Sequence, residues 1–215
     1  MKSNNNLQKF KGQFGEFIIE KSDRTGVIIY RAGLVVAGLS FAIGSGLILS
    51  FGATPLVLQM LTLLFGIFSF GLAVSLVTIH IYLITLHRTL QIFWLIGTIS
   101  AFILSLTSNQ PLALFVYNQP LSIFGIGFSF AALTGIYFKE AFCFNRLETK
   151  LLTPLVPALL LGHLVGILPR EAEKILLAIW AILFIVFVWR KTVQPIPPDI
   201  GDKSVFAYLK QQNSV

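Results

Sequence analysis

The sequence predicts an all-α membrane protein, a bundle of about six transmembrane helices with both the N- and C-termini cytoplasmic. Between Ala32 and Phe138 the chain carries one formally charged side chain, Arg88. Hydrophobic residues make up 55% of the 215 residues and charged residues 12%, against about 25% charged in ordinary globular proteins. A soluble surface needs charge, whereas an isolated charge in lipid costs roughly 2.5 kcal/mol or more. The composition therefore excludes an ordinary soluble domain.

Three regions follow from this pattern. Residues 1–31 form a polar cytoplasmic arm, residues 32–189 form the membrane domain, and residues 190–215 form a cytoplasmic tail. No short apolar segment with a small-residue cleavage site precedes the first span, so we expect insertion through the first membrane helix and no cleaved signal peptide.

The arm could fold in two ways. It carries Glu16, Asp23, Arg24 and Arg31 as candidate contact residues. Its two apolar runs could pair as a hairpin, or Ser22 or Asp23 could cap a helix that continues into the first span. We favour the helix, because the chain enters the membrane directly after Arg31.

The first three spans are predicted at residues 32–51, 56–86 and 90–106. A membrane helix needs about 20 mostly apolar residues. At ~1.5 Å per residue the second would be about 46 Å long, against a hydrocarbon core of ~30 Å. We therefore expect this helix to tilt strongly or to project from the membrane.

The last three spans are predicted at residues 121–138, 151–168 and 171–189. Residues 112–116, before the fourth span, are too few to cross and are expected to form a surface or re-entrant piece. The sixth span is the shortest apolar run, and acidic residues at its start suit the positive end of a helix dipole.

The distribution of lysine and arginine favours six crossings. Short cytoplasmic loops collect basic residues, and six spans place all of them inside except Arg170 and Lys174. Tyr30, Tyr137 and Trp189 fall near the predicted cytoplasmic ends, where amphipathic rings anchor helices at the interface.

A net charge of +7 would suggest nucleic-acid binding in a soluble protein. Here the basic residues are scattered along the chain, so no nucleic acid is expected. The expected partner of this charge is the lipid bilayer with its anionic headgroups.

The connector between the fourth and fifth spans is the densest polar cluster of the membrane domain, with Lys139, Glu140, Cys143, Arg146 and Glu148. It could be a basic segment lying on headgroups. It could also be a docking surface in which Glu140, Arg146 and Glu148 pair with a partner or with the N-terminal arm. No base and orienting acid accompany Cys143 at a recognisable spacing, so catalysis by this thiol is not expected.

His163 lies inside the fifth span, between Gly162 and Gly166. It could be an axial ligand for haem or for the magnesium of chlorophyll, with the glycines leaving room for a flat macrocycle. The alternative is a neutral histidine hydrogen-bonded across helices, which we favour.

Signatures of several enzyme and transporter classes are missing from the sequence. It contains no phosphate-binding loop, HExxH or CxxC motif, and no metal site is expected. No acidic residue lies within a confident span, whereas ion-coupled carriers usually place one near the midplane. These patterns favour a protein that is not an enzyme.

Three segments together resemble a known family. They are Phe14–Phe17 with the charged residues up to Arg31, the connector 139–149, and Leu161–Leu164. The chain resembles an uncharacterised integral membrane protein family of cyanobacteria and plant plastids, classed only as a domain of unknown function. The resemblance implies a photosynthetic lineage and a bacterial inner membrane or thylakoid membrane. It transfers no activity and no catalytic residues.

The leading functional hypothesis is a non-enzymatic accessory or assembly factor of a larger, photosynthetic membrane complex, with other membrane protein subunits as partners. The first alternative is a transporter or facilitator for small solutes or lipids. It requires a water-accessible cavity lined by Ser69, Ser75, Thr78 and His163. The second alternative is a pigment-binding membrane protein.

Overall fold

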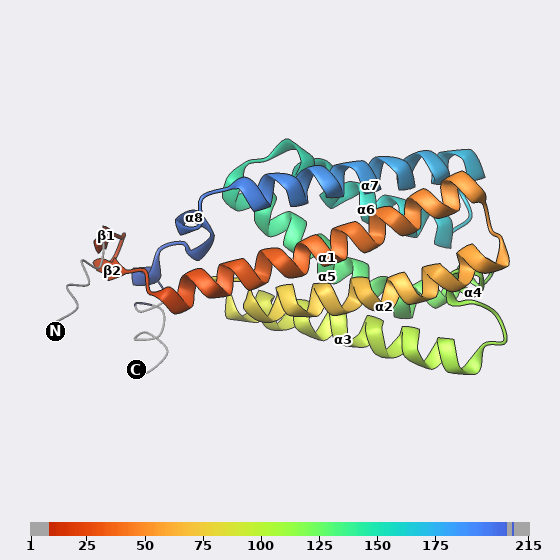
Figure 1. Ribbon diagram of the computed structural model, residues 1–215, viewed down its shortest axis with the longest axis horizontal. Helices are drawn as coiled ribbons and strands as arrows, with labels where there is room; N and C mark the ends of the chain where they lie inside the picture. Colours follow the sequence, from red (N-terminus) through yellow and green to blue (C-terminus); the bar gives the residue numbers. More distant parts are fainter. Residues whose placement is uncertain (1–8, 206–207, 209–215) are drawn as a thin grey trace.

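The computed structural model describes residues 9–205 and 208. The remaining residues of the predicted arm (1–8) and of the predicted tail (206–207 and 209–215) lie outside the described residues. Figure 1 shows the elements, which in chain order are β1 (Lys9–Lys11), β2 (Glu16–Ile18), α1 (Lys21–Phe51), α2 (Pro55–Thr78), α3 (Ile84–Thr107), α4 (Leu112–Asn118), η1 (Pro120–Ser122), α5 (Ile123–Phe144), α6 (Leu147–Leu164), α7 (Arg170–Val193) and α8 (Pro197–Ile200).

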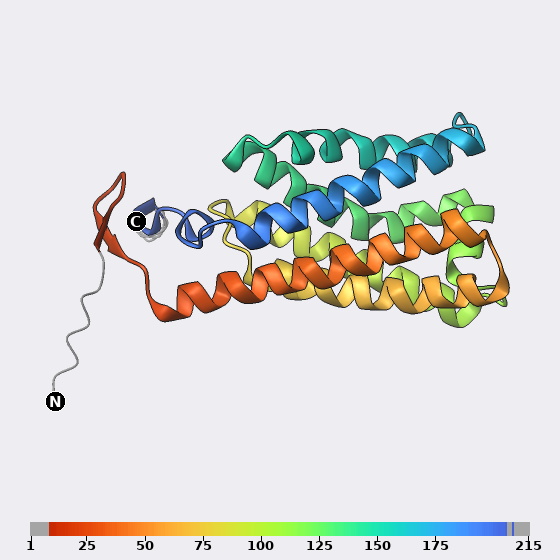
Figure 2. The same cartoon turned by 45° about the horizontal axis from the view of Figure 1, so that its top comes forward.

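The long helices form a closed ring. α1 packs on α2 and α7, α2 on α3, α3 on α5, α5 on α6, and α6 on α7. Figures 1 and 2 show these helices running side by side, with alternating direction along the chain. The start of α1 and the end of α7 therefore lie at one end of the bundle, here called the terminal end. The short helix α4 lies at the opposite, far end (Figure 1).

Among the described residues, five helical segments are long and apolar enough to cross a membrane: α1, α2, α3, α5 with its preceding η1 turn, and α7. α6 has 18 residues and is about 27 Å long at ~1.5 Å per residue. It packs against both α5 and α7 and runs along the upper edge of the bundle in Figure 2, and so it returns the chain from the terminal end to the far end.

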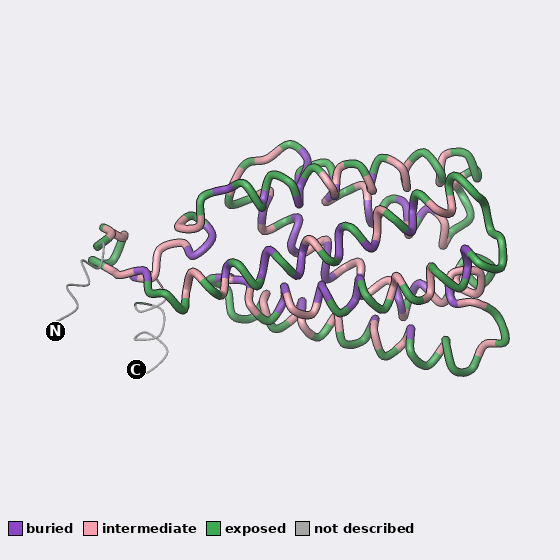
Figure 3. The backbone as a smooth tube through the Cα atoms, in the orientation of Figure 1, coloured by how far each residue is buried: buried purple, intermediate pink, exposed green. Residues whose placement is uncertain are grey.

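Aromatic side chains fill the middle of the ring. Phe41 of α1 packs against Trp180 of α7 in a tilted arrangement with ring centroids 4.3 Å apart, and Phe68 of α2 contacts Phe130 of α5 at 5.5 Å. These aromatic side chains connect helices that lie on different sides of the closed bundle. Figure 3 shows the buried backbone positions on the inner faces and exposed positions on the outer faces. The outer faces carry large apolar residues such as Phe70, which is 70% exposed, as a lipid-facing surface requires.

Two helix pairs approach closely through small residues. A Cβ on Gly33 of α1 would lie 2.6 Å from the backbone oxygen of Gly71 in α2, and one on Gly71 would lie 2.7 Å from the oxygen of Gly33. Gly97 of α3 likewise faces the backbone of Ser129 in α5. Membrane helices gain van der Waals contact in this way, since lipid supplies little hydrophobic driving force between them.

The prediction of a single long helix over residues 56–86 is wrong. α2 ends at Thr78, and Ile79 has an extended conformation. The link to α3 contains two apolar residues, Ile79 and Ile81, which are packed into the core with 4% and 8% exposure. Hydrophobicity alone therefore could not reveal the break, and no long tilted helix is needed.

The helical alternative for residues before the first span is confirmed, with a different cap. α1 begins at Lys21, its N-cap is Glu20, and the Glu20 N–H donates to Asp23 Oδ2 at 2.8 Å in a capping box. A hairpin also exists, but it pairs Lys9–Lys11 with Glu16–Ile18. It is closed by an ion pair between Lys9 and Glu16 at 3.1 Å.

The connector at residues 139–150 is not one continuous structure. α5 continues through its first half to Phe144, and α6 begins at Leu147. Asn145 ends α5 in the left-handed conformation, with φ 53°, which asparagine tolerates better than most residues. The sharp turn returns the chain to the bundle and places the polar residues on either side of it near the end of α7.

Candidate functional site

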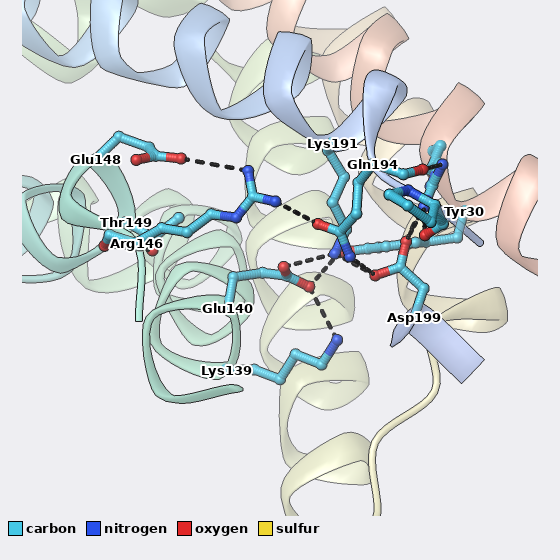
Figure 4. A network of polar contacts seen from close by, with 11 residues as sticks. Tyr30, Lys139, Glu140, Arg146, Glu148, Thr149, Lys191, Gln194 and Asp199 are labelled. Carbon is cyan, nitrogen blue, oxygen red and sulfur yellow. Dashed lines mark hydrogen bonds and ion pairs between the residues drawn. The ribbon is translucent and has the colours of Figure 1, made fainter. Parts of the chain in front are cut away.

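Charged side chains from α1, α5, α6, α7 and α8 converge at the terminal end of the bundle (Figure 4). At the centre is Lys191 of α7, whose side chain is 1% exposed. Its Nζ donates to Glu140 Oε2 at 2.6 Å and also to Asp199 Oδ1. Lys191 thus joins α5 to α8, the short helix of the tail.

Glu140 has further donors on its other oxygen. Lys139 Nζ donates to Glu140 Oε1 at 2.9 Å, and Tyr30 Oη donates to the same atom at 3.1 Å. Glu140 is fully buried. The last turns of α5 are thereby held to α1 and α7.

Arg31 of α1 binds the tail. Its Nε and Nη2 donate to Asp199 Oδ2 at 2.9 and 2.6 Å. Its Nη1 and Nη2 also donate to the backbone oxygens of Gln194 and Pro195, at 2.6 and 3.0 Å. These carbonyls follow the end of α7, where a cation also interacts favourably with the helix dipole.

A second branch links the start of α6 to the same network. Gln194 Nε2 donates to Asp199 Oδ1 at 3.0 Å, while its Oε1 accepts from Arg146 Nη2 at 2.6 Å. Arg146 lies 3.9 Å from Glu148, whose Oε2 accepts from Arg190 Nη1 at 2.8 Å. Figure 4 shows this branch running from Glu148 through Arg146 to Gln194.

The network can act as a structural clamp. Burying separate charges costs several kcal/mol each, and pairing offsets this cost only when the hydrogen-bond geometry is good. Here Lys191 and Glu140 are both paired and hydrogen-bonded, and the Lys191 ammonium lies 4.3 Å from the centroid of the Phe144 ring. The paired charges at Lys191, Glu140 and Asp199 favour a fixed arrangement of the elements that carry them.

The hairpin and the tail meet beyond the network. The backbone N–H of Gln13 donates to Asp202 Oδ2 at 2.6 Å, and Ser204 Oγ donates to Asp202 Oδ1 at 2.6 Å. Burial acts to raise the pKa of Asp202, but these hydrogen bonds outweigh it and hold the pKa below the usual value. Phe14 stacks on Tyr208 with centroids 4.1 Å apart. We call residues 9–20 and 194–205 together the arm–tail platform.

The five connector residues singled out from the sequence lie at this end, but they do not form one open surface. Glu140 and Glu148 are buried, and Lys139 is partly buried beside Glu140. Arg146 is half-buried, and Cys143 is exposed. Glu140 accepts from Tyr30 of α1, whereas Arg146 and Glu148 pair with Gln194 and Arg190 at the end of α7.

The arm residues are dispersed. Arg31 belongs to the network, and Asp23 accepts from Lys203 at 2.8 Å. Glu16 pairs with Lys9 in the hairpin, and Arg24 is half-buried on α1. Of these four residues, Arg31 and Asp23 are the ones that pair with the part of the tail that the structure describes.

Several network residues were not predicted from the sequence. They are Lys191, Gln194 and Asp199. Two residues expected as interfacial anchors, Tyr30 and Tyr137, are instead buried, with 2% and 0% exposure. Trp189 is exposed at 68%. One usable signal was Asp199, an acidic residue close after the basic end of α7.

His163 lies at the far end of the bundle and bridges helices. Its Nδ1 is 2.6 Å from Glu173 Oε1 of α7, and its Nε2 is 3.2 Å from the backbone oxygen of Tyr117 in α4. Tyr117 Oη also donates to Glu173 at 3.0 Å. Both ring nitrogens have protein partners, so ligation of haem or chlorophyll by His163 would require breaking one of these contacts.

The polar residues proposed to line a transport cavity also have partners. Ser69 Oγ lies 2.7 Å from Thr98 Oγ1, Ser75 Oγ donates to the Tyr30 carbonyl at 3.0 Å, and Thr78 Oγ1 donates to the Val74 carbonyl at 2.7 Å. Within residues 9–205 and 208, no three histidine, cysteine or acidic side chains are grouped as a metal site would require.

Comparison with known families settles the class. Residues 74–208 match the model of the uncharacterized integral membrane protein family DUF2301. The chain belongs to this family. The matched region runs from the end of α2 into the tail and contains Glu140, Lys191 and Asp199, whereas Tyr30 and Arg31 precede it. No curated protein and no solved structure is significantly similar to the chain. The protein is an integral, multi-pass membrane protein, as the sequence predicted.

Proposed function

We propose that the protein is a non-enzymatic accessory or assembly factor of a larger membrane complex, in a bacterial inner membrane or a thylakoid membrane. The observation that carries this proposal is the use of the buried charges at the terminal end. They bind the tail to the bundle instead of lining a path through it, and the tail in turn contacts the arm through Asp202. A fixed arm–tail platform on a closed bundle suits a protein whose task is to hold another protein.

In this proposal the bundle crosses the membrane six times, with α6 as the fifth crossing and both ends cytoplasmic. The arrangement of α1 and α7 supports it, because Arg31 near the start of α1 contacts residues just after α7. The predominance of lysine and arginine at the terminal end supports the cytoplasmic side.

The partner surface combines water-exposed and lipid-exposed parts. The exposed arm residues Phe14 and Glu16 and the thiol of Cys143 lie on the cytoplasmic part. Next to Cys143, Phe142 and Phe138 are 83% and 54% exposed and stacked on each other. They offer an apolar contact to a transmembrane segment of the partner. Glu140 supports this surface from within.

Cross-linking from Cys143, the only cysteine of the chain, tests the proposal. A thiol-attached photo-crosslinker in native membranes should give a discrete adduct with another subunit, and gentle solubilisation should preserve a complex larger than the monomer. The matched control places the probe at Asn109→Cys in a Cys143→Ser background, because Asn109 is exposed near the far end. A lone monomer with no adduct would refute the proposed function.

A further inference from the structure

A cleft of about 510 Å³ lies at the terminal end, between the turn after α5 and the end of α7. Two arginines, Arg146 and Arg190, line it together with the apolar side chains of Leu147 and Val193. The cleft is separate from the centre of the ion-pair network, and the proposed docking surface does not use it.

The two arginines have unused hydrogen-bonding capacity. Arg190 is 51% exposed and uses Nη1 on Glu148, while Arg146 is 21% exposed and uses Nη2 on Gln194. In the described part of the chain, the Nε groups of Arg146 and Arg190 have no hydrogen-bond acceptor. A guanidinium presents its donors in a planar fork that matches phosphate oxygens.

The local charge is positive. Glu148 is the acidic residue that contacts both arginines, and its side chain is 4% exposed. One buried negative charge against two cationic side chains leaves an excess positive charge at the cleft. This excess attracts an anion from the cytoplasmic side.

The apolar rim points to a lipid and not to a free anion. Leu147 and Val193, which line the cleft, are 68% and 64% exposed, and the neighbouring Trp189 is 68% exposed. Tryptophan is enriched at the headgroup level of membranes. An anion with an attached acyl chain satisfies both parts of the cleft at this level, whereas a soluble phosphate would leave the apolar rim uncovered.

We propose that this cleft binds an anionic glycerophospholipid. Arg146 and Arg190 hold the headgroup phosphate, and Leu147 and Val193 contact the first part of an acyl chain. The lipid joins the start of α6 to the end of α7, and thereby strengthens the part of the network that contains Gln194.

The test measures lipid retention by native mass spectrometry of the full-length protein in mild detergent, with phosphatidylglycerol and phosphatidylcholine of equal chain length as probes. We expect the wild type to prefer phosphatidylglycerol about tenfold. Arg146→Gln/Arg190→Gln should reduce this preference to about twofold or less. The control Lys21→Gln/Arg88→Gln removes the same charge from exposed positions of the terminal end and should retain the preference.

Glu148→Gln tests whether the two arginines bind lipid or serve only to stabilise the buried carboxylate of Glu148. It keeps both arginines and removes the competing carboxylate, so the preference for phosphatidylglycerol should rise about threefold. If the double arginine variant does not fold, the triple variant Arg146→Gln/Glu148→Gln/Arg190→Gln leaves no unpaired carboxylate and should also lack the preference.

Three results would overturn the lipid site. The first is equal retention of both lipids by the wild type, and the second is an unchanged preference in a folded arginine variant. The third is displacement of phosphatidylglycerol by excess inorganic phosphate, which would show that the cleft takes a free anion. Loss of the Cys143 adduct with intact lipid preference would contradict the docking proposal alone.

Discussion

Lys191 donates to two carboxylates that belong to different elements, Glu140 of α5 and Asp199 of α8. The lysine and both acids are almost fully buried. Removal of one partner from such a group leaves an uncompensated charge, which costs far more than the loss of a surface pair. The effect of each charged residue on stability therefore depends on its place in the network.

Lys191→Met should destabilise the folded protein by about 3 to 5 kcal/mol. The cause is the loss of the shared donor between Glu140 and Asp199. The midpoint of thermal unfolding in detergent measures the effect. Lys174→Met is the matched control, because Lys174 pairs with Glu171 on the exposed surface of α7, where a pair contributes about 0 to 1 kcal/mol.

Adding Glu140→Gln to Lys191→Met should restore part of the lost stability, since Glu140, which keeps Lys139 as a partner, then no longer buries a charge that has lost one of its two ammonium donors. Equal shifts for the Lys191 and Lys174 variants, or no recovery in the double variant, would show that the network does not hold the bundle together.

At this scale the sequence indicated only part of the site. The cluster around Lys139 and Glu140 was visible as the densest polar stretch between spans. Its partners were not, because Arg31 and Asp199 are 168 positions apart and no local pattern relates them. Burial of Tyr30 and Tyr137 was also unpredictable, since a tyrosine at a helix end fits an interface or a core equally well.

Helix contacts of the bundle depend on a few glycines, and α1 offers a matched pair. A Cβ on Gly33 would meet the backbone of α2, whereas a Cβ on Gly46 would meet nothing within 4 Å. Gly33→Ala should therefore destabilise the protein by about 1 to 3 kcal/mol through overpacking. Gly46→Ala should be neutral or stabilising by up to about 1 kcal/mol, because alanine favours helix. Thermal unfolding of both variants tests this, and a reversed order would contradict the close α1–α2 contact.

The hairpin–tail contact should depend on pH through Asp202. Hydrogen bonds keep the folded-state pKa of Asp202 below its ordinary value of 3.8. A depressed carboxyl pKa contributes stability above the unfolded-state value, and that stability is lost as the pH falls through the folded-state value. We expect the contact to persist at pH 5 and above, and to weaken below about pH 4.

Distances between spin labels at Lys11→Cys and Pro198→Cys, in a Cys143→Ser background, measure this contact. Both positions are exposed. Asp202→Ala should broaden the distance distribution already at neutral pH. A distribution that is the same at pH 3 and pH 7, or unaffected by Asp202→Ala, would contradict the role of this carboxylate.

Most helices could be predicted from the sequence, because long apolar runs bounded by polar residues fix their approximate positions. The bounds were less accurate where charged residues are buried. α5 and α7 continue to Phe144 and Val193, beyond the predicted ends at 138 and 189, because their terminal charges pair within the bundle. The break after Thr78 was missed for the opposite reason, since the link there is apolar and packed.

At the scale of the whole molecule, six crossings place Cys143 and Asn109 on opposite sides of the membrane. In intact cells or right-side-out vesicles, a membrane-impermeant maleimide should label Asn109→Cys and spare Cys143. In inverted vesicles the pattern should reverse. Labelling of both positions from one side would contradict the proposed topology.

The sequence predicted a helical bundle but not the order in which the helices neighbour one another. Apolar composition gives membrane class and the number of long segments, but the order of neighbours depends on which small residues meet. Gly33 with Gly71, and Gly97 with Ser129, select the α1–α2 and α3–α5 contacts, while Gly46 and Gly66 in the same spans face open space.

The contact between Arg31 and Asp199 also sets an order of events during synthesis. At ~5 to 20 residues per second, Arg31 leaves the ribosome roughly 8 to 34 s before Asp199. The ion-pair network is therefore completed after all six long helices have been made. A chain interrupted just before Asp199 keeps Arg31 and Lys191 without one of their acids, and we expect pulse-chase labelling to show faster degradation of this fragment than of a chain ending at Val205. Equal lifetimes would contradict this. Asp199 thus completes the network only after the last long helix, α7, has been synthesised.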